Sequence, residues 1–125
     1  AFDRAGRPLP PDVREARELH ALAARRGALK STWRPSAGDL LFLADRPGGP
    51  AEHVGLVERT EPDGTALVLH RVARGVQRLR VNLSFPQRRV DPATGRHIND
   101  TLVVGARPQP AGSLVVAVSD LLRRG

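Results

Sequence analysis

Four short apolar runs between Gly38 and Val81 constrain the fold of this chain more than any other feature of its sequence. Each run is rich in Val and Leu, has the length of a strand and is bounded by residues that favour turns. Pro62-Asp63-Gly64 is such a turn, because Pro fixes φ and Gly tolerates a positive φ, and Ala73-Arg74-Gly75 is another. The segment therefore predicts an antiparallel meander with strands at Asp39–Ala44, His53–Glu58, Ala66–Val72 and Val76–Val81.

Two histidines occupy positions on this meander that favour contact between their side chains. His53 opens the second predicted strand and His70 lies late in the third. A hairpin centred on Pro62-Asp63 places residue 53 opposite residue 72, so that residue 70 is its diagonal neighbour on the same face. The Cβ atoms of diagonal neighbours lie about 7 Å apart, within reach of two imidazoles or of a water between them. The pattern therefore predicts that the His53 and His70 side chains lie close together, and the structural alternative for each is a hydrogen-bonded rim residue.

The segment before the meander predicts helices. Asp12–Arg26 is the clearest, because Asp12 and Glu15 have capping-box spacing, apolar residues recur with helical period and Gly27 follows. Ala1–Ala5 has the pattern of a last helical turn, which is not stable alone. We therefore expect a single domain over residues 1–125 that is truncated at its N-terminus.

After Val81 the pattern predicts a long irregular stretch, one more strand and a final helix. Asn82–Asp100 is irregular, Thr101–Val104 has the composition of a short strand and Pro108–Gly112 is a break. Ser113 can cap a helix over Leu114–Arg124, and a strand over Leu114–Val118 is the competing interpretation. The expected fold class is α+β, with one main helix on an antiparallel sheet of four to six strands and a C-terminal helix; an open barrel satisfies the same strand pattern.

The charge and residue types of the chain restrict its partners. A net charge of +7 at pH 7, carried almost wholly by Arg, permits attraction to an anionic polymer of the cell wall, to anionic lipid or to nucleic acid. The arginines are spread along the chain without interleaved aromatic residues, which disfavours nucleic acid. No apolar run approaches the ~20 residues of a membrane span, and no signal or transit peptide is visible. The chain holds no Cys, and therefore no disulfide and no thiol nucleophile.

Several short motifs, taken in their order, resemble the core of the NlpC-type and CHAP-type cell-wall peptidases. These motifs are GDLLF (Gly38–Phe42), HVGLV (His53–Val57), Leu69-His70 and Gly75-Val76. FDRAGRPLP (Phe2–Pro10) is similar to the segment that follows the nucleophile helix of that family. The resemblance covers Ala1 to Val81. It implies a papain-like fold and a bacterial cysteine amidohydrolase or endopeptidase that acts on peptidoglycan peptides, in the cell envelope or secreted.

The resemblance also implies roles for single residues. In that family a Cys at a helix N-terminus is the nucleophile, so His53 would be the base and His70 the residue that orients the imidazole. The resemblance places the missing Cys about two helical turns before Ala1. No cofactor is expected, and no metal, because a zinc site of the two histidines with an acidic neighbour lacks the usual short ligand spacing. Candidate substrate-binding residues are Trp33, Asp39, Gly48, Gly49 and Glu52.

Alternatives remain for these residues and for the chain as a whole. Trp33 can stack on a ligand or pack over an edge of the fold, and the glycines of Arg46–Glu52 can admit a substrate or simply join two strands. The leading hypothesis is a hydrolase domain whose Cys lies outside the sequence, so that this chain alone is inactive. The second hypothesis is a pseudoenzyme that binds an anionic cell-wall or protein partner. The third is a small basic β-barrel that binds nucleic acid with strong salt dependence.

Overall fold

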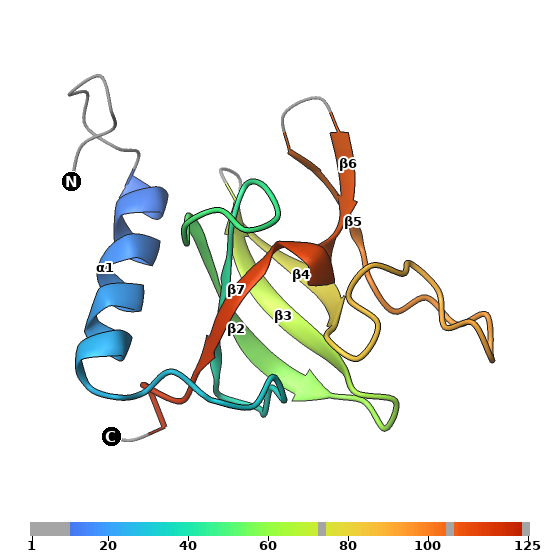
Figure 1. The fold of residues 1–125 in the computed structure, drawn as a ribbon, viewed down its shortest axis with the longest axis horizontal. Coiled ribbons are helices and arrows are strands. Elements are labelled where there is room, and N and C mark those ends of the chain that lie inside the picture. Colours follow the sequence, from blue (N-terminus) through green and yellow to red (C-terminus); the bar gives the residue numbers. More distant parts are fainter. Residues whose placement is uncertain (1–10, 73–74, 105–106, 124–125) are drawn as a thin grey trace.

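In the computed structural model, the described residues (11–72, 75–104 and 107–123) form an α-helix, a five-stranded antiparallel sheet and a two-stranded ribbon (Figure 1). The sheet has the order β4-β3-β2-β1-β7, and β5 pairs with β6 to make the ribbon. Figure 1 shows helix α1 on one side of the sheet and the ribbon on the other. The elements are α1 (Pro11–Arg25), β1 (Leu40–Leu43), β2 (His53–Thr60), β3 (Thr65–Val72), β4 (Gly75–Asn82), β5 (Thr101–Val104), β6 (Arg107–Pro110), the 3-10 helix η1 (Ala111–Leu114) and β7 (Val115–Ser119).

The predicted meander is confirmed as β1 to β4, and so is the register of its central hairpin on the side of the histidines. Gly55 lies opposite His70 and Leu56 opposite Leu69, which is the pairing of a hairpin centred on Pro62-Asp63. A bulge after Val57 changes the register toward the turn. The Asp63 carboxylate accepts a hydrogen bond of 2.9 Å from the Thr65 amide, as Asx turns do. Ala73 and Arg74 of the second predicted turn lie outside the described residues.

The main helix is confirmed with its ends one position earlier than predicted. It begins at Pro11, which is tolerated in a first turn because the amide there has no helical partner. Gly27 has φ 63° and ends it, and the Ala28 amide then donates to the Ala23 carbonyl at 2.8 Å. The short helix expected at Ala1–Ala5 lies outside the described residues. Within those residues no helix is long and apolar enough to cross a membrane.

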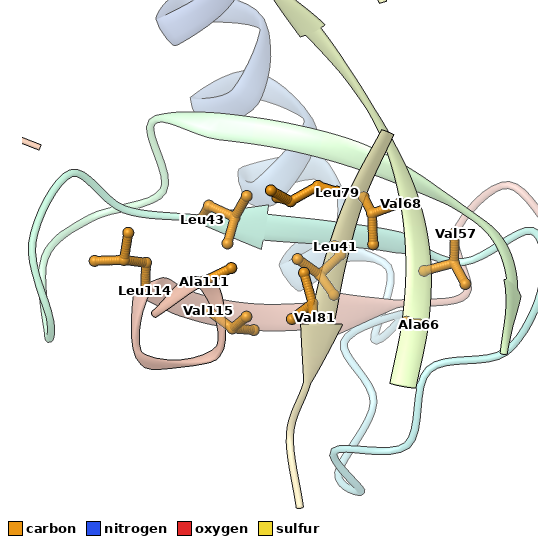
Figure 2. Close-up of a cluster of buried hydrophobic side chains, with 10 residues drawn as sticks. All are labelled: Leu41, Leu43, Val57, Ala66, Val68, Leu79, Val81, Ala111, Leu114 and Val115. Carbon is orange, nitrogen blue, oxygen red and sulfur yellow. The ribbon is translucent and has the colours of Figure 1, made fainter. Parts of the chain in front are cut away.

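Strand β1 is buried on both faces, which explains why its sequence, LLFL, has no polar alternation. Leu41 and Leu43 belong to a first apolar cluster, in which side chains from the two edge strands of the sheet point toward one another (Figure 2). Leu40 and Phe42 face a second cluster against α1, which includes Ala23 and Ala28. The first cluster comprises Leu41, Leu43, Val57, Ala66, Val68, Leu79, Val81, Ala111, Leu114 and Val115.

The sheet curls around the first cluster. Leu79 and Val81 come from the edge strand β4, whereas Leu114 and Val115 come from η1 and the opposite edge strand β7. Residues of η1 contact β4 directly, so the two edges are drawn together. A flat sheet could not bring these side chains into one cluster.

The predicted C-terminal helix over Leu114–Arg124 is wrong. The chain forms η1 and then strand β7, which pairs antiparallel with β1, so the competing interpretation of a strand is correct in kind. The Val-rich composition of Val115–Ser119 favours a strand, and the free edge of β1 supplies its hydrogen-bond partners. Ser113 does not cap a helix here; its hydroxyl donates to the Pro110 carbonyl at 2.7 Å.

The predicted strand Thr101–Val104 is confirmed as β5, but its partner was missed. The break expected at Pro108–Gly112 is instead strand β6 followed by η1. Two prolines fall in β6, and Pro is tolerated in a two-stranded ribbon because an edge strand leaves some amides without a ladder partner.

The irregular segment after β4 is fastened by the buried side chain of Asn99. Its Oδ1 accepts from the amides of Asn82 and Gly112 at 2.8 and 2.9 Å. Its Nδ2 donates to the carbonyls of Phe85 and Arg88 at 2.9 and 2.8 Å. One amide group thus joins the end of β4, the irregular segment and η1.

Replacing Asn99 with Ala should destabilise the fold by about 3 kcal/mol, because several buried backbone groups lose their partners together. The free energy of unfolding from urea titration measures this loss. Gln87→Ala, an exposed amide in the same segment, is the control and should change it by less than about 0.5 kcal/mol. Equal effects of the two substitutions would contradict the role given to Asn99.

Candidate active site

The two predicted histidines meet at one end of the β2–β3 hairpin. Their ring centroids lie 5.9 Å apart and the ring planes are nearly perpendicular, at 81°. Gly55 lies directly opposite His70 and two residues after His53. A Cβ at position 55 would approach Val68 Cγ1 to 2.3 Å, so β2 and β3 can pack this closely only with Gly there. The diagonal contact predicted from the hairpin register is confirmed.

A third residue, Asp45, contacts His53 and was missed by the sequence analysis. Its Oδ1 lies 2.6 Å from His53 Nε2. Asp45 lies two residues after the end of β1, and His53 opens β2 opposite Leu43. The loop between the two strands therefore brings its first residues next to His53. The pairing of Leu43 with His53 is the one signal that could have indicated Asp45, because a polar side chain just beyond position 43 lies near the residue that faces it.

Glu52 extends the contact to the helix. Its carboxylate accepts a hydrogen bond of 3.1 Å from the Arg17 guanidinium on α1. A hydrogen bond between the Glu52 and Asp45 carboxyl groups is the main cause that lowers the pKa of Asp45. Burial raises this pKa, but the hydrogen bond and charge of His53 and the charge of Arg46 lower it further. The pKa of Glu52 is raised, mainly by the same hydrogen bond with Asp45 and then by burial and the charge of Asp45. The hydrogen bond and charge of Arg17 partly offset this rise. Of the two acids, Asp45 therefore ionises first and Glu52 holds its proton longer.

A groove of about 450 Å³ runs beside the histidine pair, between α1 and the sheet. Both imidazoles line it, together with Gly55. Most of its other lining is apolar, and Leu56 is partly exposed (38%) although it lies in the middle of a strand. The apolar lining residues include Leu19, Leu40, Val54, Leu56, Leu69 and Leu122. The arrangement places the His53 imidazole, a group that can accept a proton, next to a space that fits an apolar group.

The predicted glycine loop joins β1 to β2 and carries the acidic residues of the site. Gly48 has φ 78°, a conformation that favours Gly, and the Gly49 amide donates to the Arg46 carbonyl at 3.0 Å. The Glu52 amide returns to the Leu43 carbonyl at 2.8 Å. Of the predicted substrate-binding residues, Gly48, Gly49 and Glu52 therefore lie in the loop that holds Asp45 against His53.

The structure does not bring the other two predicted residues to the histidine pair. Asp39 lies at the opposite end of β1 from Leu43, the partner of His53. Its carboxylate is fully buried and accepts from Lys30 at 2.9 Å and from Arg123 at 3.1 Å. These contacts make Asp39 a link between three parts of the chain.

Trp33 lies at the far end of the hairpin from His53. Its side chain is 48% exposed and lines a separate cavity of about 350 Å³ near the β2–β3 turn. Thr60, Glu61 and Ser84 supply polar groups to that cavity. Trp33 is thus open to solvent, as a stacking residue would be, but it is remote from the candidate catalytic pair.

Within the described part of the chain, no group of three or more His, Asp or Glu side chains is arranged to hold a metal ion. Comparison of the whole chain with protein-family models, curated protein sequences and solved structures finds no match. The chemistry of the site therefore rests on its own geometry.

Replacing Glu52 with Gln should stabilise the fold relative to the wild type as the pH rises. Because the folded-state pKa of Glu52 is raised, protonation of Glu52 favours the native state fully below its ordinary value of 4.5. That contribution is lost as the pH rises through the raised pKa, whereas Gln cannot ionise. Urea unfolding of both proteins at pH 4.5 and pH 7 should give a larger Gln-minus-Glu difference at pH 7.

Glu58→Gln is the matched control, since Glu58 is on the same strand and pairs with Arg78 at 3.0 Å instead of with a second acid. It should not gain stability relative to the wild type as the pH rises. A Glu52→Gln difference that is the same at both pH values would show that the two acids do not share a proton.

Proposed function

We propose that this chain is the histidine-bearing part of a papain-like, NlpC/CHAP-type amidohydrolase or endopeptidase domain that acts on peptidoglycan peptides. The observation that carries the proposal is the contact of His53 with a carboxylate, at 2.6 Å, beside a second histidine and an apolar groove. The order of the motifs GDLLF, HVGLV and Leu69-His70 along the sequence supports it independently.

In the proposed reaction His53 is the base. The imidazole takes the proton of a thiol, the thiolate attacks the carbonyl carbon of an amide, and the C–N bond breaks as the imidazolium gives its proton to the departing amine. Water then hydrolyses the thioester, with the same imidazole as base, and restores the thiol. The 125 residues contain no Cys, so this thiol must come from outside them, and the chain by itself has no hydrolase activity.

The groove indicates the character of the substrate next to the reacting amide. Its lining by Leu19, Leu56 and Leu69 favours an apolar side chain, because burying apolar surface there removes it from water. Leu56 and Leu122, at 38% and 57% exposed, leave apolar surface for a bound chain to cover. A peptide with small or medium apolar side chains fits these properties.

A second candidate is a binding module that uses the same groove without catalysis, and the absence of Cys from the sequence favours it. A peptide would bind beside His53 and leave unchanged. The basic surface gives nucleic acid less support, since several arginines are engaged with acids: Arg78 with Glu58, Arg80 and Arg96 with Glu61, and Arg123 with Asp39.

The test is hydrolysis of peptidoglycan-derived peptides by the encoded protein that contains these residues, with its upstream sequence determined. His53→Ala should lower kcat by about 10²- to 10⁴-fold, the usual contribution of a general base. His97→Ala is the matched control: its Nε2 lies 2.7 Å from Asp100 Oδ1, a similar pair that does not line the groove, and activity should persist.

Full activity in His53→Ala would overturn the proposal. Turnover by the 125-residue chain itself would contradict the need for an external thiol. If no upstream Cys is encoded and the peptides bind without turnover, the binding module replaces the hydrolase.

A further inference from the structure

We infer that Asp45, rather than His70, is the positioning residue for His53, and that it holds the imidazole with its proton on Nε2 and the lone pair on Nδ1. The inference deepens the proposed function and rests on it for its catalytic meaning. The placement of the proton is a property of the folded chain that can be measured without any reaction.

The Asp45–His53 contact has the character of a charge-assisted hydrogen bond. The separation of 2.6 Å between Oδ1 and Nε2 is slightly shorter than the ~2.7–2.9 Å that is usual for such bonds. An ionised carboxylate only accepts hydrogen bonds, so the shared proton belongs to Nε2. A neutral imidazole carries one N–H, and Nδ1 is then the nitrogen that can accept a proton from a nucleophile.

His70 contacts His53 in a different way. Ring centroids 5.9 Å apart at an interplanar angle of 81° define an edge-to-face packing of two rings. Such a contact limits how far the His53 ring can swing but does not select one ring nitrogen as strongly as a carboxylate does. His70 therefore restricts the orientation of the His53 ring by packing against it.

The loop holds Asp45 by backbone hydrogen bonds on both sides. The Ala44 amide donates to the Leu114 carbonyl and the Glu52 amide donates to the Leu43 carbonyl, both at 2.8 Å. The Gly49 amide closes a turn onto the Arg46 carbonyl at 3.0 Å. A side chain on a loop fixed in this way can position its partner without being buried itself.

Glu52 and Arg17 complete the support. Glu52 shares a hydrogen bond with Asp45 and its own carboxylate is held by Arg17 at 3.1 Å. The groups that act on Asp45 are therefore Glu52, His53 and Arg46. Helix α1 reaches the imidazole through this chain of contacts, because Arg17 holds the partly buried Glu52, which in turn contacts Asp45.

The experiment is nitrogen-15 NMR of the histidine rings in the labelled chain at neutral pH, for the wild type, Asp45→Ala, Asp45→Asn and His70→Ala. The wild type should show His53 as the Nε2–H tautomer, with a cross-peak from its hydrogen-bonded ring proton. Asp45→Ala should lose that cross-peak through exchange with water, and its ring nitrogens should shift toward a mixture of tautomers. Asp45→Asn, which keeps an acceptor oxygen, should retain part of the signal, and His70→Ala should retain it fully.

The resonances of His97, which pairs with Asp100, report in the same spectra whether each variant is folded. Asp45 is half exposed (50%), so its truncation opens no core cavity. The inference is overturned if His53 carries its proton on Nδ1, if Asp45→Ala leaves the His53 signals unchanged, or if His70→Ala abolishes the cross-peak. These outcomes do not depend on hydrolysis, so they are separate from failure of the peptidase test above.

Discussion

Strand β1 is covered on both faces and paired on both edges, and the positions of the other elements follow from that constraint. Its side chains alternate between two apolar clusters, with Leu41 and Leu43 in one and Leu40 and Phe42 in the other. Its backbone pairs with β2 on one side and β7 on the other. This four-residue strand thus separates the apolar cluster against α1 from the apolar cluster inside the curled sheet.

The packing of β1 also fixes the relative positions of Asp45 and His53 in the candidate site. Where β1 ends, the chain leaves the core at Ala44 and re-enters it at Ala51, both of which are buried. The intervening loop has little freedom, since its two ends are separated by the width of a strand pair. Asp45 and His53 therefore meet as a consequence of core packing, and the hydrogen bond between them does not have to order the loop by itself.

Sequence reasoning worked where one local pattern decides the structure and failed where a distant segment does. The turn at Pro62–Gly64 and the strand patterns beside it predict the hairpin, and with it the approach of His53 to His70. The bulge after Val57, which adjusts the register on the side of the histidines, leaves no local pattern. The C-terminal segment could not, because Leu114–Val118 is apolar enough for either element and the open edge of β1, far away in sequence, decides for a strand. Asp45 was missed because a loop carboxylate has no periodicity, and Asn99 because hydrogen bonds to irregular backbone leave no pattern.

The pairing of β1 with β7 has a consequence for the order in which the chain can fold. Leu40 and Ser119 are partners, so most of the sequence separates β1 from the edge strand β7 that completes the sheet. Contacts of such long range slow folding, because the loop must close before the contacts form. During synthesis an apolar strand edge stays unpaired until residue 119 is available, and such edges recruit other chains. The Asp39 carboxylate pairs with Lys30, which precedes the sheet, and with Arg123, which follows it. Both ion pairs can therefore form only after the C-terminal segment has been synthesised and has packed against the sheet.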